Sequence, residues 1–211
     1  VYMGHRAENI DGAELVVYSA AIKEDNPERK AAVEQGIPCI ERSVMLGVVT
    51  RRYKRSIAVS GTHGKTTTSS MCATMLDRMG LDPSFLIGGI VEGYDTNGKN
   101  GSGDYFVAEA DESDSSFLFL NPNVVIVTNV EADHLDFFKD LKDIEHSFHA
   151  FADLVPQRGY VISNADDQGA REAVAGLSHP VFTFSLADRT ADCYARDVAF
   201  FDGCASFDVM I

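Results

Sequence analysis

The sequence lacks the features of membrane-spanning, secreted and zinc-binding proteins. No apolar run approaches the roughly 18 residues that a membrane span requires, and no signal peptide opens the chain. No two cysteines form a Cys-x-x-Cys pair, and no histidines stand at the spacing of zinc ligands. We therefore expect a cytoplasmic protein with reduced, mostly buried thiols, namely Cys39, Cys72, Cys193 and Cys204.

The sequence is also short of positive charge. It contains 18 Lys+Arg against 32 Asp+Glu, for a formal net charge of −14. A protein that binds nucleic acid or an anionic membrane on its own usually carries the opposite sign, so we expect neither as a partner. The surplus is uneven, because residues 104–145 contain eleven acidic residues and two lysines. A bound cation would offset part of this negative charge.

What is present is an ordinary globular composition. The hydrophobic fraction of 45% and the charged fraction of 24% exclude disorder, collagen and coiled coil. At roughly 150 residues per domain, 211 residues correspond to one large domain or one and a half smaller ones. The chain starts at Val1 without an initiator Met and ends in an apolar segment at Ile211. We expect a piece of a longer protein.

Apolar, β-branched segments alternate with helical patterns along the chain, which predicts an α/β fold with a parallel sheet and helices on its faces. The predicted strands are 15–19, 37–40, 57–60, 105–110, 124–129, 160–162 and 181–184, with one or two more in 192–211. The predicted helices are 26–36, 43–53, one that ends at residue 79, 139–154 and 167–175. Residues 88–103 are rich in Gly, Asn and Asp and predict a loop. Met71, Met75 and Met79 have i, i+4 spacing and are expected to face the core.

The strongest motif is Ser-Gly-Thr-His-Gly-Lys-Thr-Thr-Thr at residues 60–68, between a predicted strand and a predicted helix. Glycines let several backbone N–H groups point at one centre, and a helix N-terminus adds partial positive charge. Lys65 can reach terminal phosphates and the Thr66 hydroxyl can hold Mg²⁺. The standard pattern has a glycine five residues before Gly64, where this chain has Val59. A phosphate-binding loop is favoured over a structural turn.

Acidic residues follow two of the predicted strands, in segments 109–117 and 129–136. Ligands of open α/β sheets bind outside the carboxyl ends of the strands, so both segments are expected to meet the phosphate loop. Mg²⁺ prefers oxygen ligands. Glu109 is the first candidate ligand because it directly ends an apolar strand. The weaker candidates are Asp111, Glu112 and Asp114.

Two histidines lie in these segments. His134 stands beside Asp133 and Asp136 just past a strand end, and a functional role and a structural one both stay open. His63 lies inside the phosphate loop and could simply shape it. No Gly-x-Ser-x-Gly or Cys–His arrangement indicates a covalent nucleophile.

The sequence motifs at residues 61–68, 109–117 and 129–134 closely resemble those of the Mur ligase family. Residues 4–9 and 19–21 are similar to the later part of that family's first domain, so the resemblance extends over essentially the whole chain. It implies the end of a Rossmann-like domain that binds a UDP substrate in residues 1–52. It further implies an incomplete ATP-binding central domain with a phosphate loop in 53–211, with helices on both faces of a mostly parallel sheet. The family's C-terminal domain is expected to be absent.

The resemblance also implies an activity. It implies that ATP phosphorylates the carboxylate of UDP-N-acetylmuramate, and that the amino group of L-alanine then displaces the phosphate, in peptidoglycan precursor synthesis. Lys65 would neutralise the transferred group, Thr66 and Glu109 would hold Mg²⁺, and His134 would lie near a second metal. The residues expected to bind the ATP phosphates are Gly61, Thr62, His63, Gly64, Lys65, Thr66 and Thr67. His5 and Ser19 would lie near the UDP moiety, and the fragment alone is expected to be inactive.

Three alternatives stay open. The same nucleotide sugar could receive a recycled murein tripeptide. The sequence Glu-Ser-Asp-Ser-Ser-Phe at 112–117 favours alanine as the added group. Folylpolyglutamate synthesis is a more distant alternative. The chain could also be a non-catalytic nucleotide-binding module whose acidic strand ends meet a partner.

Overall fold

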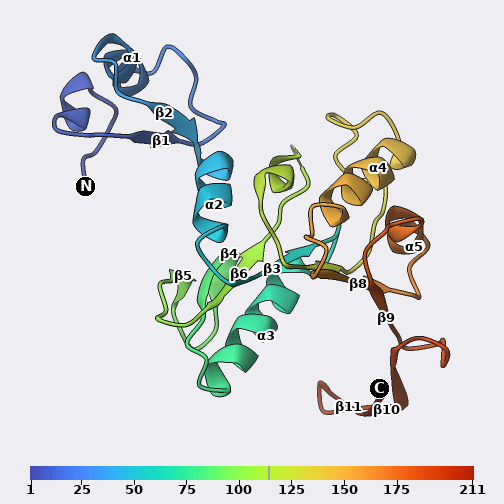
Figure 1. The fold of residues 1–211 in the computed structure, drawn as a ribbon. Helices are drawn as coiled ribbons and strands as arrows, with labels where there is room; N and C mark the ends of the chain where they lie inside the picture. The colour runs from blue at the N-terminus through green and yellow to red at the C-terminus, as the bar shows by residue number, and fades with distance from the viewer. Residues whose placement is uncertain (114) are drawn as a thin grey trace.

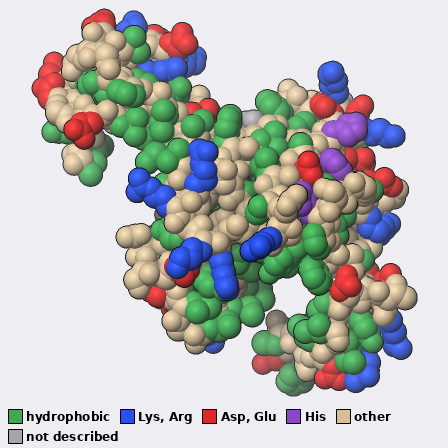
Figure 2. Space-filling model, viewed as in Figure 1, with side chains coloured by type: hydrophobic (Ala, Val, Ile, Leu, Met, Phe, Trp, Pro, Cys, Tyr) green, Lys and Arg blue, Asp and Glu red, His purple; other side chains and the backbone are tan. Residues whose placement is uncertain are grey.

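The computed structural model describes residues 1–113 and 115–211 of the chain. Asp114, a weaker metal candidate, lies outside the described residues. The chain forms a small N-terminal unit joined through one helix to a larger sheet with helices (Figure 1). Figure 2 shows the N-terminal unit as a lobe that stands apart, and Lys and Arg side chains gathered in the middle of the visible face. Within the described part of the chain, no helix is both long and apolar enough to cross a membrane.

The N-terminal unit contains two short parallel strands, β1 (Val16–Tyr18) and β2 (Cys39–Glu41), with α1 (Pro27–Glu34) and the 3₁₀ turn η1 (Ala7–Ile10). The start of α1 follows the sequence, because the Asn26 side chain accepts hydrogen bonds from the backbone N–H groups of Glu28 and Arg29. Its core is small and consists of Ile10, Ala31 and Ala32, packed by neighbouring half-buried side chains. Helix α2 (Arg42–Thr50) leads into the larger sheet.

The larger sheet has nine strands in the order β11-β10-β9-β8-β7-β3-β6-β4-β5. Pairing is parallel from β10 to β4 and antiparallel in the pairs at the two edges, so the predicted mostly parallel sheet is confirmed. The strands are β3 (Arg55–Ser60), β4 (Ser84–Val91), β5 (Thr96–Lys99), β6 (Tyr105–Glu109), β7 (Val124–Val127), β8 (Tyr160–Asn164), β9 (Val181–Ser185), β10 (Cys193–Phe201) and β11 (Cys204–Met210). The remaining helical elements are α3 (Lys65–Arg78), η2 (Ser116–Phe119), α4 (Leu141–Ala152) and α5 (Gln168–Val174).

Helices cover both faces of the sheet. Successive side chains of a strand point to opposite faces, so one strand contributes to the cores on both sides. In β6, Val107 packs in the core that contains Ala73 of α3. Its neighbours Phe106 and Ala108 pack in the other core, which includes side chains of η2, α4 and α5. The predicted arrangement of helices on both faces is therefore confirmed.

The larger core contains a cluster of three phenylalanines. The Phe117 ring stacks on that of Phe151, with ring centroids 4.5 Å apart, and meets that of Phe148 edge-on at 5.5 Å. All three side chains are buried. The cluster fixes η2, which follows the segment after Glu109, against α4.

Three expectations about packing are wrong. Met71, Met75 and Met79 are not core residues, since they are 60%, 61% and 69% exposed. Helix α3 packs on the sheet through Ala73 and its half-buried neighbours, and i, i+4 spacing alone does not tell which face of a helix is covered. Residues 88–103 are not all loop, because they contain the end of β4 and all of β5, paired as a hairpin. The four cysteines are free, as expected, but three are only half-buried and Cys204 is exposed.

We predict that Phe148→Ala lowers the free energy of unfolding by about 3–5 kcal/mol, because it removes a fully buried ring from this cluster. Met75→Ala should change it by no more than about 0.5 kcal/mol, because the side chain is exposed. Urea denaturation of the chain measures both values. Equal losses in the two variants would contradict this packing.

Candidate functional site

Three segments far apart in sequence meet at one edge of the larger sheet. Strand β3 lies between β6 and β7, and Val59 is opposite both Glu109 of β6 and Ile126 of β7. Parallel strands end at the same edge, so the loop after β3, Glu109 and the residues after β7 come together there.

The loop between β3 and α3 is held by Thr128 and Asn129, which follow β7. The backbone N–H of His63 donates to Asn129 Oδ1 at 2.7 Å. The His63 carbonyl accepts from Asn129 Nδ2 at 2.9 Å and from Thr128 Oγ1 at 2.7 Å. Gly61 has φ +144°, and a Cβ there would lie 2.0 Å from Thr128 Oγ1, so only glycine fits. His63 therefore contributes through its backbone, while its ring lies 3.9 Å from Glu131.

Sequence reasoning did not select Thr128 and Asn129 as site residues. In the sequence, Asn129 is only the first residue of the acidic segment 129–136. The signal available was their position directly after a strand that pairs with the strand before the phosphate loop.

Lys65 is the first residue of α3, and its ammonium folds back over the loop. It donates to Gly61 O at 2.7 Å and to Glu112 Oε1 at 2.8 Å, with a longer contact to Thr62 O at 3.4 Å. Gly64, with φ 84°, is the N-cap residue just before the helix, and no side chain in the described part of the chain caps the helix. An uncapped helix N-terminus offers backbone N–H groups to an anion.

The Glu112 carboxyl is almost completely buried beside Lys65, with 3% of its side chain exposed. Burial raises the pKa of Glu112, and its hydrogen bond with Lys65 opposes that rise. The sequence placed Glu112 among the weaker metal candidates, whereas the structure gives it the lysine as its partner.

Thr66 and Glu109 place two oxygen-bearing groups side by side. Thr66 Oγ1 donates to Glu109 Oε1 at 3.0 Å, and the backbone N–H of Gly88 donates to Glu109 Oε2 at 2.7 Å. A Cβ at Gly88 would come within 2.9 Å of Glu109 Oε1, and one at Gly89 within 2.9 Å of Thr66 Cγ2. The two glycines of β4 therefore make room for this pair.

These groups fit Mg²⁺, which takes one or two protein oxygens and keeps several waters. The described residues contain no group of three or more His, Cys, Asp or Glu side chains that could hold a metal by themselves. His134 has φ 51°, is partly exposed, and lies 3.9 Å from Asp133. In the described part of the chain, no hydrogen bond or ion pair joins His134 to Lys65, Thr66 or Glu109.

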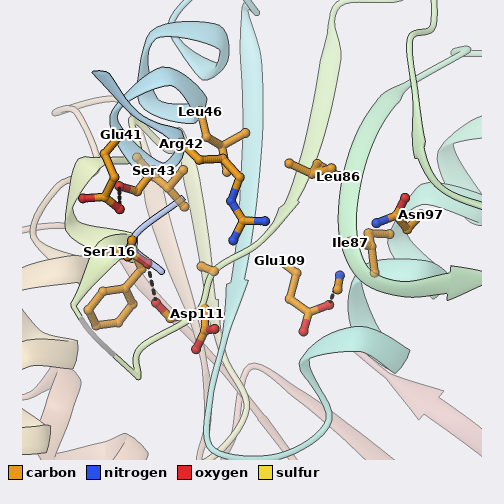
Figure 3. Close-up of a pocket in the computed structure, with 15 residues that line it drawn as sticks. Glu41, Arg42, Ser43, Leu46, Leu86, Ile87, Asn97, Glu109, Asp111 and Ser116 are labelled. Atoms are coloured by element: carbon orange, nitrogen blue, oxygen red, sulfur yellow. Dashed lines mark hydrogen bonds between the residues drawn. The ribbon is translucent and has the colours of Figure 1, made fainter. Parts of the chain in front are cut away.

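A cleft of about 340 Å³ opens beside Glu109, between the N-terminal unit and strands β4 and β6. Figure 3 shows the Arg42 guanidinium, from the start of α2, pointing into this cleft near Leu86 and Glu109. Asp111 and Ala20, which follows Ser19, also line it. His5 does not line the cleft. Its Nδ1 lies 2.9 Å from Glu28 on α1.

The site consists of a strand, a glycine-bearing loop and a helix whose first two residues are a lysine and a threonine, with a strand-end carboxylate beside the threonine. This arrangement defines a nucleotide-binding α/β protein of the phosphate-loop class. Comparison with known families agrees and is more specific. The "Mur ligase middle domain" matches residues 59–211, and "Mur ligase family, catalytic domain" matches residues 1–54. The chain belongs to the Mur ligase family.

Individual relatives are informative about the branch of the family. The UDP-N-acetylmuramate–L-alanine ligase of Acetivibrio thermocellus is 45% identical over 211 residues, and that of Caldanaerobacter subterraneus is 43% identical over 206. These matches cover 100% and 97% of this chain but 45% of each relative, so the chain spans less than half of their length.

Solved structures of two family members have the same fold. The UDP-N-acetylmuramate:L-alanyl-γ-D-glutamyl-meso-diaminopimelate ligase of Neisseria meningitidis aligns with a TM-score of 0.85 and 31% identity, covering 100% of this chain and 69% of that one. The UDP-N-acetylmuramate–alanine ligase of Thermotoga maritima aligns with a TM-score of 0.77 and 28% identity, covering 93% of this chain and 44% of that one.

We predict that Asn129→Ala loosens the phosphate loop, because it removes the two hydrogen bonds of the Asn129 side chain with the backbone N–H and C=O of His63. The backbone N–H of His63 should exchange with solvent about tenfold faster, the factor expected from losing one hydrogen bond. Amide hydrogen exchange measures this rate without any ligand. Asn129→Asp is the matched control, because it keeps the acceptor for His63 N–H and should keep most of the protection. Equal exchange in the wild type and Asn129→Ala would contradict the clamp.

Proposed function

We propose that the chain is the nucleotide-binding part of a ligase that joins L-alanine to the carboxylate of UDP-N-acetylmuramate at the expense of ATP. The observation that carries this proposal is the shared sheet edge, which brings Lys65 of the phosphate loop next to the Thr66–Glu109 pair. The relatives at 43–45% identity are named for this reaction. Peptidoglycan precursor synthesis and a cytoplasmic location follow from the same proposal.

The reaction needs phosphoryl transfer and then displacement. A carboxylate oxygen attacks the γ-phosphorus of ATP, and the bond to ADP breaks, which leaves an acyl phosphate. The amino group of L-alanine attacks the carbonyl carbon, loses a proton, and phosphate leaves. Such transfers depend on positioning and charge neutralisation rather than on a protein nucleophile, which agrees with the absence of one among the motifs.

Each residue then has a role within this proposal. Backbone N–H groups of the loop from Gly61 to Thr67 bind the phosphates, and Lys65 neutralises the transferred group. Thr66 and Glu109 hold Mg²⁺, which would supply charge neutralisation at the phosphate oxygens. The second-metal role of His134 stays a prediction, because its side chain contacts Asp133 rather than this pair.

The cleft next to Glu109 is the proposed place for the nucleotide sugar. Residues 1–52 would be the end of the domain that binds it, and 53–211 part of the domain that binds ATP. Arg42 brings a cation from the first unit to the edge of the second, where an anionic substrate would need it. Ser19 lies next to a lining residue. The expected contact of His5 with UDP has no support from its position, because His5 does not line the cleft and its Nδ1 lies 2.9 Å from Glu28 of α1.

The murein tripeptide ligase is the nearest alternative. It is represented by the Neisseria meningitidis structure, at 31% identity. Two alanine ligases exceed this identity, at 45% and 43%, while that of Thermotoga maritima lies below it at 28%. The first two favour alanine as the added group.

We predict that phosphate release from ATP by the full-length protein requires both UDP-N-acetylmuramate and L-alanine. Lys65→Ala should lower its rate by about 100-fold or more, because the transferred phosphoryl group loses its cation. A coupled phosphate assay measures the rate with each substrate omitted in turn. Stimulation by murein tripeptide instead of L-alanine would identify the recycling ligase. No stimulation by either would indicate a nucleotide-binding module.

We also predict that Glu109→Ala raises the Mg²⁺ concentration for half-maximal turnover of the full-length protein about tenfold or more, because the metal loses a charged ligand. Asp104→Asn is the matched control. It removes an exposed carboxylate just before the opposite end of β6, paired with Lys54 at 2.9 Å, and should leave the Mg²⁺ dependence unchanged. An unchanged Mg²⁺ titration for Glu109→Ala would overturn the assignment.

A further inference from the structure

Glu112 is a buried carboxylate to which the proposed reaction gives no role. Its Oε1 lies 2.8 Å from Lys65 Nζ, and the two side chains are 3% and 15% exposed. Its Oε2 is buried and has no hydrogen-bond partner among the described residues. A buried charge is costly unless it is paired, so Lys65 is what makes this carboxylate tolerable.

The contacts of the Lys65 ammonium determine where its N–H groups point. A lysine ammonium has three N–H groups, and good hydrogen bonds are shorter than about 3.2 Å. Two of the three are used at normal distances, by Glu112 Oε1 and by Gly61 O. The remaining contact, to Thr62 O, is long at 3.4 Å. Two protein acceptors therefore hold Lys65, and one N–H is left over the loop for a phosphate oxygen.

The backbone of Glu112 is hydrogen-bonded to the residue just before η2. Its carbonyl accepts a hydrogen bond from Ser115 N–H at 3.0 Å, immediately before η2. That turn carries Phe117, which is locked into the buried aromatic cluster. The backbone of Glu112 is thus tied to the core beside the sheet edge, which supports a side chain that orients another one.

We propose that Glu112 is a positioning residue that orients the Lys65 ammonium toward the phosphates of the bound nucleotide. This rests on the proposed function of the loop. The role needs a carboxylate of the right length. A neutral amide weakens the bond to Lys65, and a shorter carboxylate places the charge too far away.

The test uses the full-length protein and reads Lys65 directly. An amine-reactive reagent is added in the presence of EDTA, and modification of each lysine is followed by mass spectrometry. Glu112→Gln and Glu112→Asp should each raise the rate at Lys65 about tenfold, as expected from losing one charge-assisted hydrogen bond. Lys99, which pairs with Asp77 and Asp82 at 2.7 and 2.8 Å, is the internal control and should not change.

The same variants are then assayed for turnover. Both should lower kcat about tenfold while the KM for ATP changes by less than about threefold, because orientation matters most in the transition state. An unchanged rate of Lys65 modification, or an unchanged kcat, would overturn the proposal. So would a raised Mg²⁺ requirement without faster Lys65 modification, which would make Glu112 a metal ligand. Asp104→Asn, which removes an exposed carboxylate just before the opposite end of β6, controls for the loss of charge alone and should change neither readout.

Failure of the proposed function would look different. ADP should protect Lys65 of the wild type from modification if the loop binds nucleotide phosphates. Lack of protection would argue against the proposed function itself. Protection without any effect of the Glu112 variants would remove only the positioning role.

Discussion

The parallel pairing of β3 with β6 on one side and β7 on the other decides where the candidate side chains lie. Strands that run in the same direction end at the same edge, so the phosphate loop, Glu109 and Asn129 meet without any helix having to bring them together. The pairs are buried on both faces, which leaves little freedom for the register to slip. The strand ends that carry the site are therefore held in a fixed register at the centre of the sheet.

The segments that meet at this edge of the sheet approach one another closely because glycines occupy three of the contact positions. A Cβ at Gly61 would overlap Thr128, and one at Gly88 or Gly89 would press on Glu109 or Thr66. Glycine is costly in a strand because it gains no packing and loses more entropy on folding. The paired glycines inside β4 are explained by the room they leave for the Thr66–Glu109 pair, and this links the second strand from the edge to the chemistry at the centre.

The sequence predicted what depends on local pattern and missed what depends on neighbours. The strand–loop–helix unit around Lys65 and the strand ending at Glu109 were predictable, because alternation, glycine spacing and strand ends are local signals. The exposure of Met75 was not, since spacing shows a stripe but not what packs on it. Asn129 and Glu112 act through contacts across 66 and 47 residues of sequence, which no single segment reveals.

The positions of individual carboxylates in the structure change the interpretation of the negative net charge. Among the carboxylates between residues 104 and 145, Glu112 is cancelled by Lys65, and Asp104 is paired with Lys54 at the far edge. Glu109 faces a hydroxyl and a backbone N–H, neither of which carries a full charge. Of these three carboxylates, it is the one that keeps its negative charge without a cation in hydrogen-bond contact. The proposed divalent cation would therefore bind at Glu109, at the end of β6, rather than at Glu112 or Asp104.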